Sequence, residues 1–259
     1  MTAGGTHDGA TSQQGGGEMS DTATDREPEF PPLLSGQRAA RGVDPFAKAC
    51  ALAALGCDSG LIVHDVGVTR LAAALVLAPE VALEPAMAML PACGVGFQNA
   101  LGALGPAELA VHLDWRGGIR VNGGRCGRLR VAAGGTDPDA EPGWLVVGLE
   151  VALRLAERDP GACPERTALA EEGCAGLDPV SLLEGWARHS LVWIRRWEDG
   201  ELRALHAEWR GLVEEIGQSV TEAGRSGVFL GVDENFGMLL RAGESTHLIP
   251  LSSVLESPQ

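Results

Sequence analysis

The chain has 259 residues, of which 45% are hydrophobic, and it carries a formal net charge of −15 at pH 7. This length and apolar content predict a folded core and exclude a fully disordered chain, while the negative charge argues against direct binding of nucleic acid or of an anionic membrane surface. No apolar run reaches the ~18 residues of a membrane span, and the polar start shows no secretory signal, so we expect a cytoplasmic protein.

Cysteine and lysine usage narrows the possible chemistry. The six cysteines form no CxxC pair and no Cys/His cluster with zinc-ligand spacing, so we expect structural cysteines and no metal site. The 20 basic residues include one lysine, Lys48, and the others are arginines. Any mechanism that needs a lysine must therefore use Lys48.

The N-terminal part is expected to start as a tail and then enter a folded domain. Residues 1–29 are of low complexity and rich in Gly, Thr, Ser and Asp, which predicts a disordered tail. Asp44 followed by a proline is typical of a helix start, and the apolar spacing continues until Gly56. Strands are expected at residues 60–65 and 69–77.

The middle of the chain predicts a helix and a hairpin. A long helix is expected over residues 85–104, with a kink at Pro91. The dipeptide Asn122-Gly123 between alternating residues predicts a two-residue hairpin turn. Further strands are expected at residues 109–115 and 144–153.

The C-terminal part predicts two helices, over residues 182–197 and 201–216, and then a glycine-rich linker at residues 224–227. The short strands that follow are too few to fold alone and must dock on the main domain. This order predicts an α+β fold, with a mixed or antiparallel sheet packed with helices. We expect the main domain at residues 30–223 and a small β domain at residues 224–259.

Several segments, in this order, are similar to segments of biotin and lipoate protein ligases. DWRGGIRVNGGRCGRLRV at residues 114–131 resembles the family's W-P-N-D turn and hairpin. WLVVGLEVAL at residues 144–153 resembles its W-V-V-I-G-I-G-I-N strand, and FLGVDENFGMLL at residues 229–240 resembles the G-x-D-x-x-G-x-L-x-L segment of its small C-terminal domain. The chain thus resembles a divergent member of the biotin/lipoate protein ligase family over about residues 43–255.

The resemblance implies a class II synthetase-like ligase domain with an SH3-like β module. It also implies ATP and Mg as cofactors, which activate biotin, lipoate or a related acid as an acyl-adenylate. The acyl group then passes to a lysine of a biotinyl or lipoyl carrier domain, which is the implied partner. Family members supply positive charge for this chemistry from a Gly/Arg-rich loop, a W-P-N-D turn and a hairpin lysine.

This chain departs from the family pattern at each of these parts. Residues 64–71 read HDVGVTRL, which leaves no Gly/Arg-rich loop. Residues 115–118 read WRGG, so the amide and the acid of W-P-N-D are missing. Counting without gaps from Trp115 puts Arg125 at the position of the family lysine, and an arginine fork is not equivalent to a lysine point charge.

Five arginines within fifteen residues of this acidic chain predict an anion site, although solvated hairpin arginines would give the same pattern. The predicted catalytic residues are Arg125 and Arg128, which strict strand alternation puts on opposite faces unless Gly127 makes a bulge. The predicted ligand-binding residues are Trp115, Arg116, Gly117, Gly118, Cys126 and Gly127.

Three functions remain open from the sequence. The chain is a divergent ligase that attaches a biotin- or lipoyl-type acid to a carrier lysine, a non-catalytic homologue that binds an acyl ligand or a carrier domain, or an unrelated binding module. Formation of an acyl-adenylate separates the first from the other two, and carrier binding without turnover identifies the second.

Overall fold

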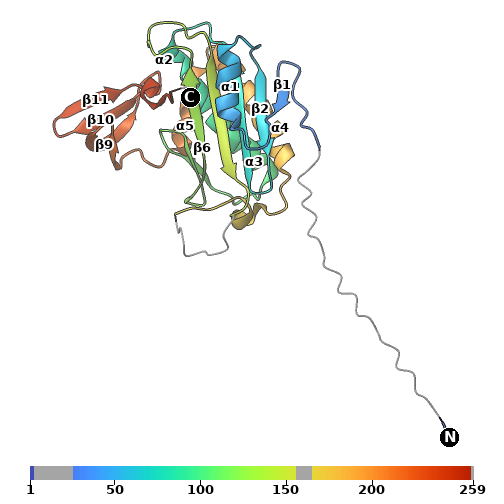
Figure 1. The fold of residues 1–259 in the computed structure, drawn as a ribbon. Coiled ribbons are helices and arrows are strands. Elements are labelled where there is room, and N and C mark those ends of the chain that lie inside the picture. Colours follow the sequence, from blue (N-terminus) through green and yellow to red (C-terminus); the bar gives the residue numbers. More distant parts are fainter. Residues whose placement is uncertain (3–25, 156–164, 258–259) are drawn as a thin grey trace.

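The computed structural model describes residues 1–2, 26–155 and 165–257 of the chain (Figure 1). The strands of the larger sheet are β1 (Ser35–Arg38), β2 (Leu61–Val66), β3 (Arg70–Leu77), β4 (Val111–Leu113), β5 (Gly118–Val121), β6 (Gly124–Ala133) and β7 (Leu145–Ala152). Their order in this seven-stranded sheet is β1-β2-β3-β7-β6-β5-β4. β1 runs parallel to β2 and the other neighbours are antiparallel, which confirms the predicted mixed sheet.

A second, four-stranded antiparallel sheet lies to one side of the larger one (Figure 1). Its strands are β8 (Ser219–Glu222), β9 (Arg225–Val232), β10 (Met238–Ala242) and β11 (Ser245–Ile249). We call residues 219–257 the C-terminal module.

Helices cover the larger sheet on both faces. They are α1 (Pro45–Ala54), α2 (Leu83–Ala86), α3 (Met89–Leu104), α4 (Pro179–Glu198) and α5 (Leu202–Leu212). α1 packs alone over one face, in a small core of its own, while α3, α4 and α5 pack into the large core on the opposite face. We call the face of the sheet that α1 covers the α1 face (Figure 1).

The start of α1 is fixed as its sequence predicts. Asp44 caps the helix, because its side chain accepts a hydrogen bond from the backbone N–H of Phe46 at 3.3 Å, and Pro45 occupies the first helical position. The ring of Phe46 then lies over Gly148 of β7, where a Cβ would come within 2.6 Å of it. The glycine in β7 therefore lets α1 approach the sheet closely.

The predicted hairpin is confirmed. Asn122 and Gly123 both have positive φ, of 48° and 85°, as a type I′ turn between β5 and β6 requires. The pairing of these strands shifts between Ile119 and Arg120, so that Arg120 lies opposite Arg125 and Ile119 opposite Gly127. Cys126 is the extra residue of this bulge.

The predicted helix over residues 85–104 is wrong in detail. The structure has two helices, α2 and α3, that break at Met87 and Ala88, and Pro91 does not kink the second one. Pro91 is the third residue of α3, where a backbone N–H has no intrahelical partner to lose. The stretch Leu83–Leu104 is long and apolar enough to cross a membrane, but 72% of its apolar 18-residue window is buried in the fold, as in a core helix.

The structure shows two features close to the predicted domain limits. β8 ends at Glu222 yet pairs with β9 in the small sheet, so this sheet begins at Ser219 and not at residue 224. Residues 223–224 form the turn of the β8–β9 hairpin. At the other end, residues 3–25 lie outside the described residues, but residues 26–29 contact α4: Arg26 Nη1 lies 2.6 Å from a carboxylate oxygen of Glu184.

Candidate functional site

The predicted site residues divide between two places in the structure. One is the junction between the larger sheet and the C-terminal module, where the β4–β5 turn lies. The other is strand β6, which carries Arg125, Cys126, Gly127 and Arg128.

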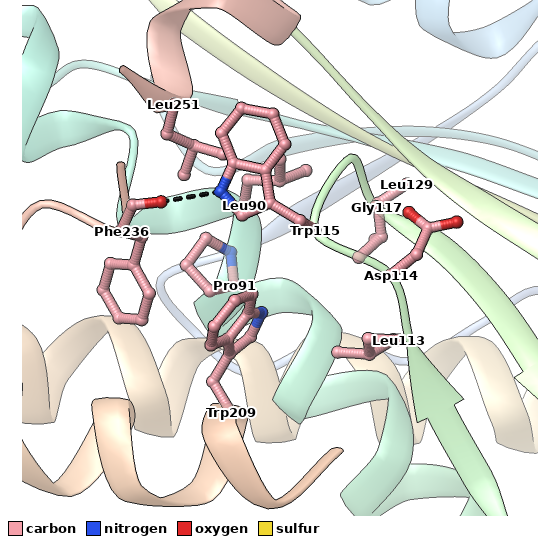
Figure 2. A pocket seen from close by; sticks show the side chains of 10 residues that line it. All are labelled: Leu90, Pro91, Leu113, Asp114, Trp115, Gly117, Leu129, Trp209, Phe236 and Leu251. Atoms are coloured by element: carbon pink, nitrogen blue, oxygen red, sulfur yellow. Dashed lines mark hydrogen bonds between the residues drawn. The ribbon is translucent and has the colours of Figure 1, made fainter. Parts of the chain in front are cut away.

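At the junction, Trp115 packs inside the fold (Figure 2). It is 2% exposed, and its indole Nε1–H donates to the backbone oxygen of Phe236 at 2.8 Å. Phe236 belongs to the turn between β9 and β10, so this hydrogen bond ties the C-terminal module to the main domain. The remaining cavity here is about 10 Å³, which is room for about one water molecule and not for an acyl ligand.

Gly117 and Gly118 close the tight turn between β4 and β5. Gly117 has φ +95°, which favours glycine, and the N–H of Gly118 donates to Oδ1 of Asp114 at 2.6 Å. A Cβ on Gly117 would come within 3.0 Å of the Leu129 backbone oxygen. The structure therefore gives these glycines a role in turn geometry and packing.

Arg116 points to the C-terminal module. Its Nη1 lies 3.1 Å from Oε2 of Glu222, a residue that is 7% exposed. This ion pair, like the Trp115 hydrogen bond, joins the two parts of the chain.

Cys126 faces the large core. It is 2% exposed, and burial raises the pKa of its thiol to about 12. A thiol with such a pKa is protonated at neutral pH and is a poor nucleophile. The neighbouring Gly127 permits close strand pairing, because a Cβ there would collide with the backbone oxygen of Glu150 on β7.

The bulge leaves both predicted catalytic arginines exposed, with Cys126 and Leu129 buried on the core side. Arg125 lies at the end of the hairpin, where its backbone pairs with the segment around Arg166. Arg128 lies further along β6 and contacts β7. Among the described residues, no carboxylate contacts both side chains.

Arg128 belongs to a row of charged groups that crosses the α1 face. Its Nε lies 3.1 Å from Oε2 of Glu150, directly opposite on β7. The other oxygen of Glu150 lies 3.0 Å from Nη1 of Arg70 on β3, and Nη2 of Arg70 lies 3.8 Å from Oδ2 of Asp65 on β2. One carboxylate thus bridges two arginines.

Arg130, two residues along the same strand, has its own carboxylates. Its Nη1 lies 2.8 Å from Oδ2 of Asp44, and its Nη2 lies 2.6 Å from Oε2 of Glu256 near the C-terminus. We call Arg70, Arg128 and Arg130 the arginine cluster. Its three guanidinium groups face four carboxylates, so the cluster carries no excess of positive charge.

Arg70 and the four carboxylates that pair with the arginine cluster were not among the predicted site residues. Glu150 had a usable signal, because it is the one charged residue in the apolar strand LVVGLEVA. Strand alternation also places Glu150 with Gly148 and Val146 on one face. Asp44 was predicted only as a helix cap, and neither it nor Glu256, which come from distant parts of the chain, had a signal that pointed to this cluster.

A larger hollow, of about 180 Å³, lies at the end of the sheet beside the β2–β3 turn. Arg154 and Cys174 contribute to its wall, but none of the eight predicted site residues does. Within the described ranges, no three His, Cys, Asp or Glu side chains gather in a group that could hold a metal ion.

The ion pairs of Glu150 with Arg70 and Arg128 predict that the stability of the fold depends on pH. Burial acts to raise the pKa of Glu150, but the hydrogen bonds from Arg70 and Arg128 outweigh it and hold the pKa below its ordinary value. A lowered folded-state pKa contributes stability above the ordinary pKa of about 4.3, and this stability is lost as the pH falls through the folded-state pKa.

We therefore expect Glu150→Gln to be less stable than the wild type at pH 7, and expect the two to converge as the pH falls below about 4. Urea unfolding at a series of pH values measures the difference. A difference in the free energy of unfolding that stays constant from pH 7 to pH 3 would contradict this account of the bridge.

Comparison with known proteins places this arrangement in a family. Residues 30–211 match the model of the "Biotin/lipoate A/B protein ligase family", and residues 216–257 match a domain of unknown function, DUF4444. The second match begins near β8, in agreement with the extent of the small sheet.

Individual relatives agree with the family match. The chain is 25% identical over 192 residues to a biotin–[acetyl-CoA-carboxylase] ligase of Paracoccus denitrificans, covering 71% of this chain and 78% of that protein. It is 61% identical to a biotin protein ligase-like protein of unknown function from Silicibacter sp. TM1040, whose crystal structure superposes with a TM-score of 0.85 over 89% of this chain and 100% of that one.

A more distant structure shares the fold. It is the biotin protein ligase of Aquifex aeolicus in complex with biotin and ATP, which is 15% identical, covers 84% of this chain and 94% of its own, and has a TM-score of 0.60. The order of strands, the two-sided packing and the family match over residues 30–211 lead to one conclusion: the chain belongs to the biotin/lipoate A/B protein ligase family.

Proposed function

We propose that this protein is a non-catalytic member of the family, which binds a biotinyl or lipoyl carrier domain in the cytoplasm and does not form an acyl-adenylate. The observation that carries the proposal is the pairing of every arginine of the arginine cluster with carboxylates of the chain itself. The chain keeps the family's fold, but the positive charges of the arginine cluster are already neutralised and are not available for acyl-adenylate formation.

The charge balance of the α1 face supports this function. ATP and an acyl-adenylate bring negative phosphates, which need preorganised positive groups around them. Here Glu150 holds Arg70 and Arg128 at 3.0 and 3.1 Å, and Arg130 lies between Asp44 and Glu256. These residues do not fit ATP, because a phosphate would have to replace carboxylates that already satisfy the guanidinium groups.

The short connection between β2 and β3 also supports a non-catalytic function. Three residues, 67–69, join the two strands, and the N–H of Gly67 donates to the oxygen of Arg70 at 2.9 Å in a tight turn. The Gly/Arg-rich loop that the family resemblance implies has no counterpart in this turn. The successive backbone N–H groups that such a loop directs at phosphates are therefore missing from this connection.

Arg125, which the sequence puts at the position of the family lysine, adds no support for catalysis. Arg125 is exposed at the end of the hairpin, and no ion pair with a described carboxylate holds its side chain. A catalytic group is normally held in position by its neighbours. Without adenylate formation, the part of the family's function that remains is recognition of the carrier. One relative of the chain is named as a biotin–[acetyl-CoA-carboxylase] ligase, whose substrate is such a carrier protein.

The experiment mixes the full chain with a biotinyl or a lipoyl carrier domain, with biotin, lipoate or octanoate, and with Mg·ATP. Calorimetry measures carrier binding and intact mass spectrometry measures acyl transfer. We expect binding of one carrier class and an unchanged carrier mass. The matched control is the carrier with its target lysine replaced by arginine.

A gain in carrier mass that needs the target lysine would contradict the proposal and would make the chain a divergent biotin/lipoate ligase. Absence of carrier binding, with no mass gain, would also contradict it. The same carrier preparation tested with an active biotin protein ligase shows that the carrier is competent.

A further inference from the structure

Residues 26–34, which we call the N-terminal strap, run from α4 to the edge strand β1. Nη1 of Arg26 lies 2.6 Å from Oε1 of Glu184 on α4, and Nη2 lies 3.0 Å from Oδ2 of Asp178, the residue that caps this helix. The backbone N–H of Glu29 donates to the same oxygen of Glu184 at 2.8 Å. The first half of the strap is therefore held by contacts with the start of α4.

Phe30, in the middle of the strap, lies over β1 and next to β2. Its ring packs against the large core, and a Cβ on Gly36 of β1 would come within 2.5 Å of it. The centre of the ring lies 6.1 Å from the centre of the His64 imidazole on β2. Gly36 thus lets the strap lie close to the sheet, directly beside His64.

His64 is buried without full hydrogen bonding. It is 3% exposed, and its Nδ1 has no hydrogen-bond partner among the described residues. The residue opposite on β3 is Ala73, which offers no polar side chain. The charged groups around the imidazole are Glu27 of the strap, Arg38 of β1 and Asp65 of β2. A buried polar atom without a partner favours a state in which water can reach it.

Protonation of His64 destabilises this arrangement further. Burial lowers the pKa of His64 below its ordinary value, and Arg38 acts in the same direction, while Glu27 and Asp65 oppose it. A histidine whose folded-state pKa is lowered favours the buried state above the ordinary pKa of about 6.5, and this preference is lost as the pH falls below that value. The cover that Phe30 gives to His64 is therefore weakest under mildly acidic conditions.

The anchor of the strap on α4 does not respond in the same pH range. Burial acts to raise the pKa of Asp178, but the hydrogen bonds from Ser181 and Arg26 outweigh it and hold the pKa below its ordinary value of about 3.9. Asp178 therefore stays ionised and paired with Arg26 at pH 5.5. The part of the strap that responds between pH 7.5 and pH 5.5 is the part beside His64.

We propose that the N-terminal strap is a pH-dependent cover, which lies over His64 at neutral pH and opens around Phe30 when His64 becomes protonated. Opening exposes the imidazole and the face of β1 that Phe30 covers. The residues involved are separate from the arginine cluster, so this proposal does not depend on the proposed function.

Hydrogen exchange followed by mass spectrometry tests the proposal in the full chain. Protection of residues 26–34 is expressed relative to the intrinsic exchange rate at each pH, which removes the ordinary pH dependence of exchange. We expect this protection to fall at least about threefold between pH 7.5 and pH 5.5 in the wild type. Protection of β7 should stay the same, because the opening is local.

Three variants identify the group that responds. His64→Leu cannot be protonated and should show the same strap protection at both pH values. His189→Gln is the matched control and should behave as the wild type does, because His189 is half-buried on α4 and burial lowers its pKa as well. Phe30→Ala should leave the strap open at both pH values, and it keeps the test valid if His64→Leu does not fold.

Equal protection of the strap at the two pH values in the wild type would overturn the proposal. A fall of wild-type size in His64→Leu or in Phe30→Ala would overturn it too, since another group would then carry the response. Loss of protection in β7 together with the strap would show general unfolding by acid and would also contradict a local cover.

Discussion

Replacing Phe236 with alanine should lower the free energy of unfolding by about 3–5 kcal/mol and loosen the C-terminal module from the main domain. The Phe236 ring is fully buried, stacks on His206 with ring centres 3.9 Å apart, and meets Trp209 edge-on at 5.5 Å. Its backbone oxygen also accepts the Trp115 hydrogen bond (Figure 2). Truncation removes the aromatic side chain that connects these groups and leaves a cavity between the two parts.

Urea unfolding of the wild type and Phe236→Ala measures this loss, and limited proteolysis between α5 and β8 reports the loosening. Leu248→Ala is the matched control, because Leu248 lies in the same module with 54% of its surface exposed. The account of the junction is wrong if Phe236→Ala and Leu248→Ala unfold at the same urea concentration.

Replacing Gly127 with valine should destabilise the main sheet at the pairing of β6 with β7. A Cβ at this position would collide with the backbone oxygen of Glu150 and come within 3.1 Å of the Cα of Val151, both on the neighbouring strand β7. Backbone cannot move aside as a flexible side chain does, so β6 and β7 must separate locally. We expect a loss of at least about 1–3 kcal/mol of stability.

Gly135→Val is the matched control, since nothing lies within 4 Å of a Cβ at that exposed glycine. Circular dichroism during thermal unfolding compares the two variants. A Gly127→Val protein with the melting temperature of Gly135→Val would show that close pairing of β6 and β7 does not require the glycine.

Local sequence signals predicted the elements that depend on local chemistry. The Asp44-Pro45 helix start and the Asn122-Gly123 turn are both present, because a capping carboxylate and two positive φ angles act within a few residues. β1 was not predicted. Its sequence, SGQR, is polar and exposed, and it forms a strand only because β2 lies beside it.

The candidate site was predictable in part. The hairpin position of Arg128 followed from the sequence, but its partner Glu150 follows only from the register of β6 against β7. Arg130 contacts Asp44 and Glu256, which are 86 and 126 residues away along the chain. Such neighbours arise from tertiary packing, and no local pattern encodes them. In the structure, Arg116, Arg128 and Arg130 each pair with a carboxylate of the chain.

The most direct test of the central claim is exchange of labelled pyrophosphate into ATP, with the full chain, Mg·ATP and biotin, lipoate or octanoate. This exchange reports reversible acyl-adenylate formation and needs no carrier domain. Because the arginine cluster is committed to carboxylates of the chain, we predict no exchange above a protein-free blank, whereas an active biotin protein ligase assayed in parallel exchanges the label. Acid-dependent exchange by this chain would contradict the account and would show that its arginines serve the family's chemistry.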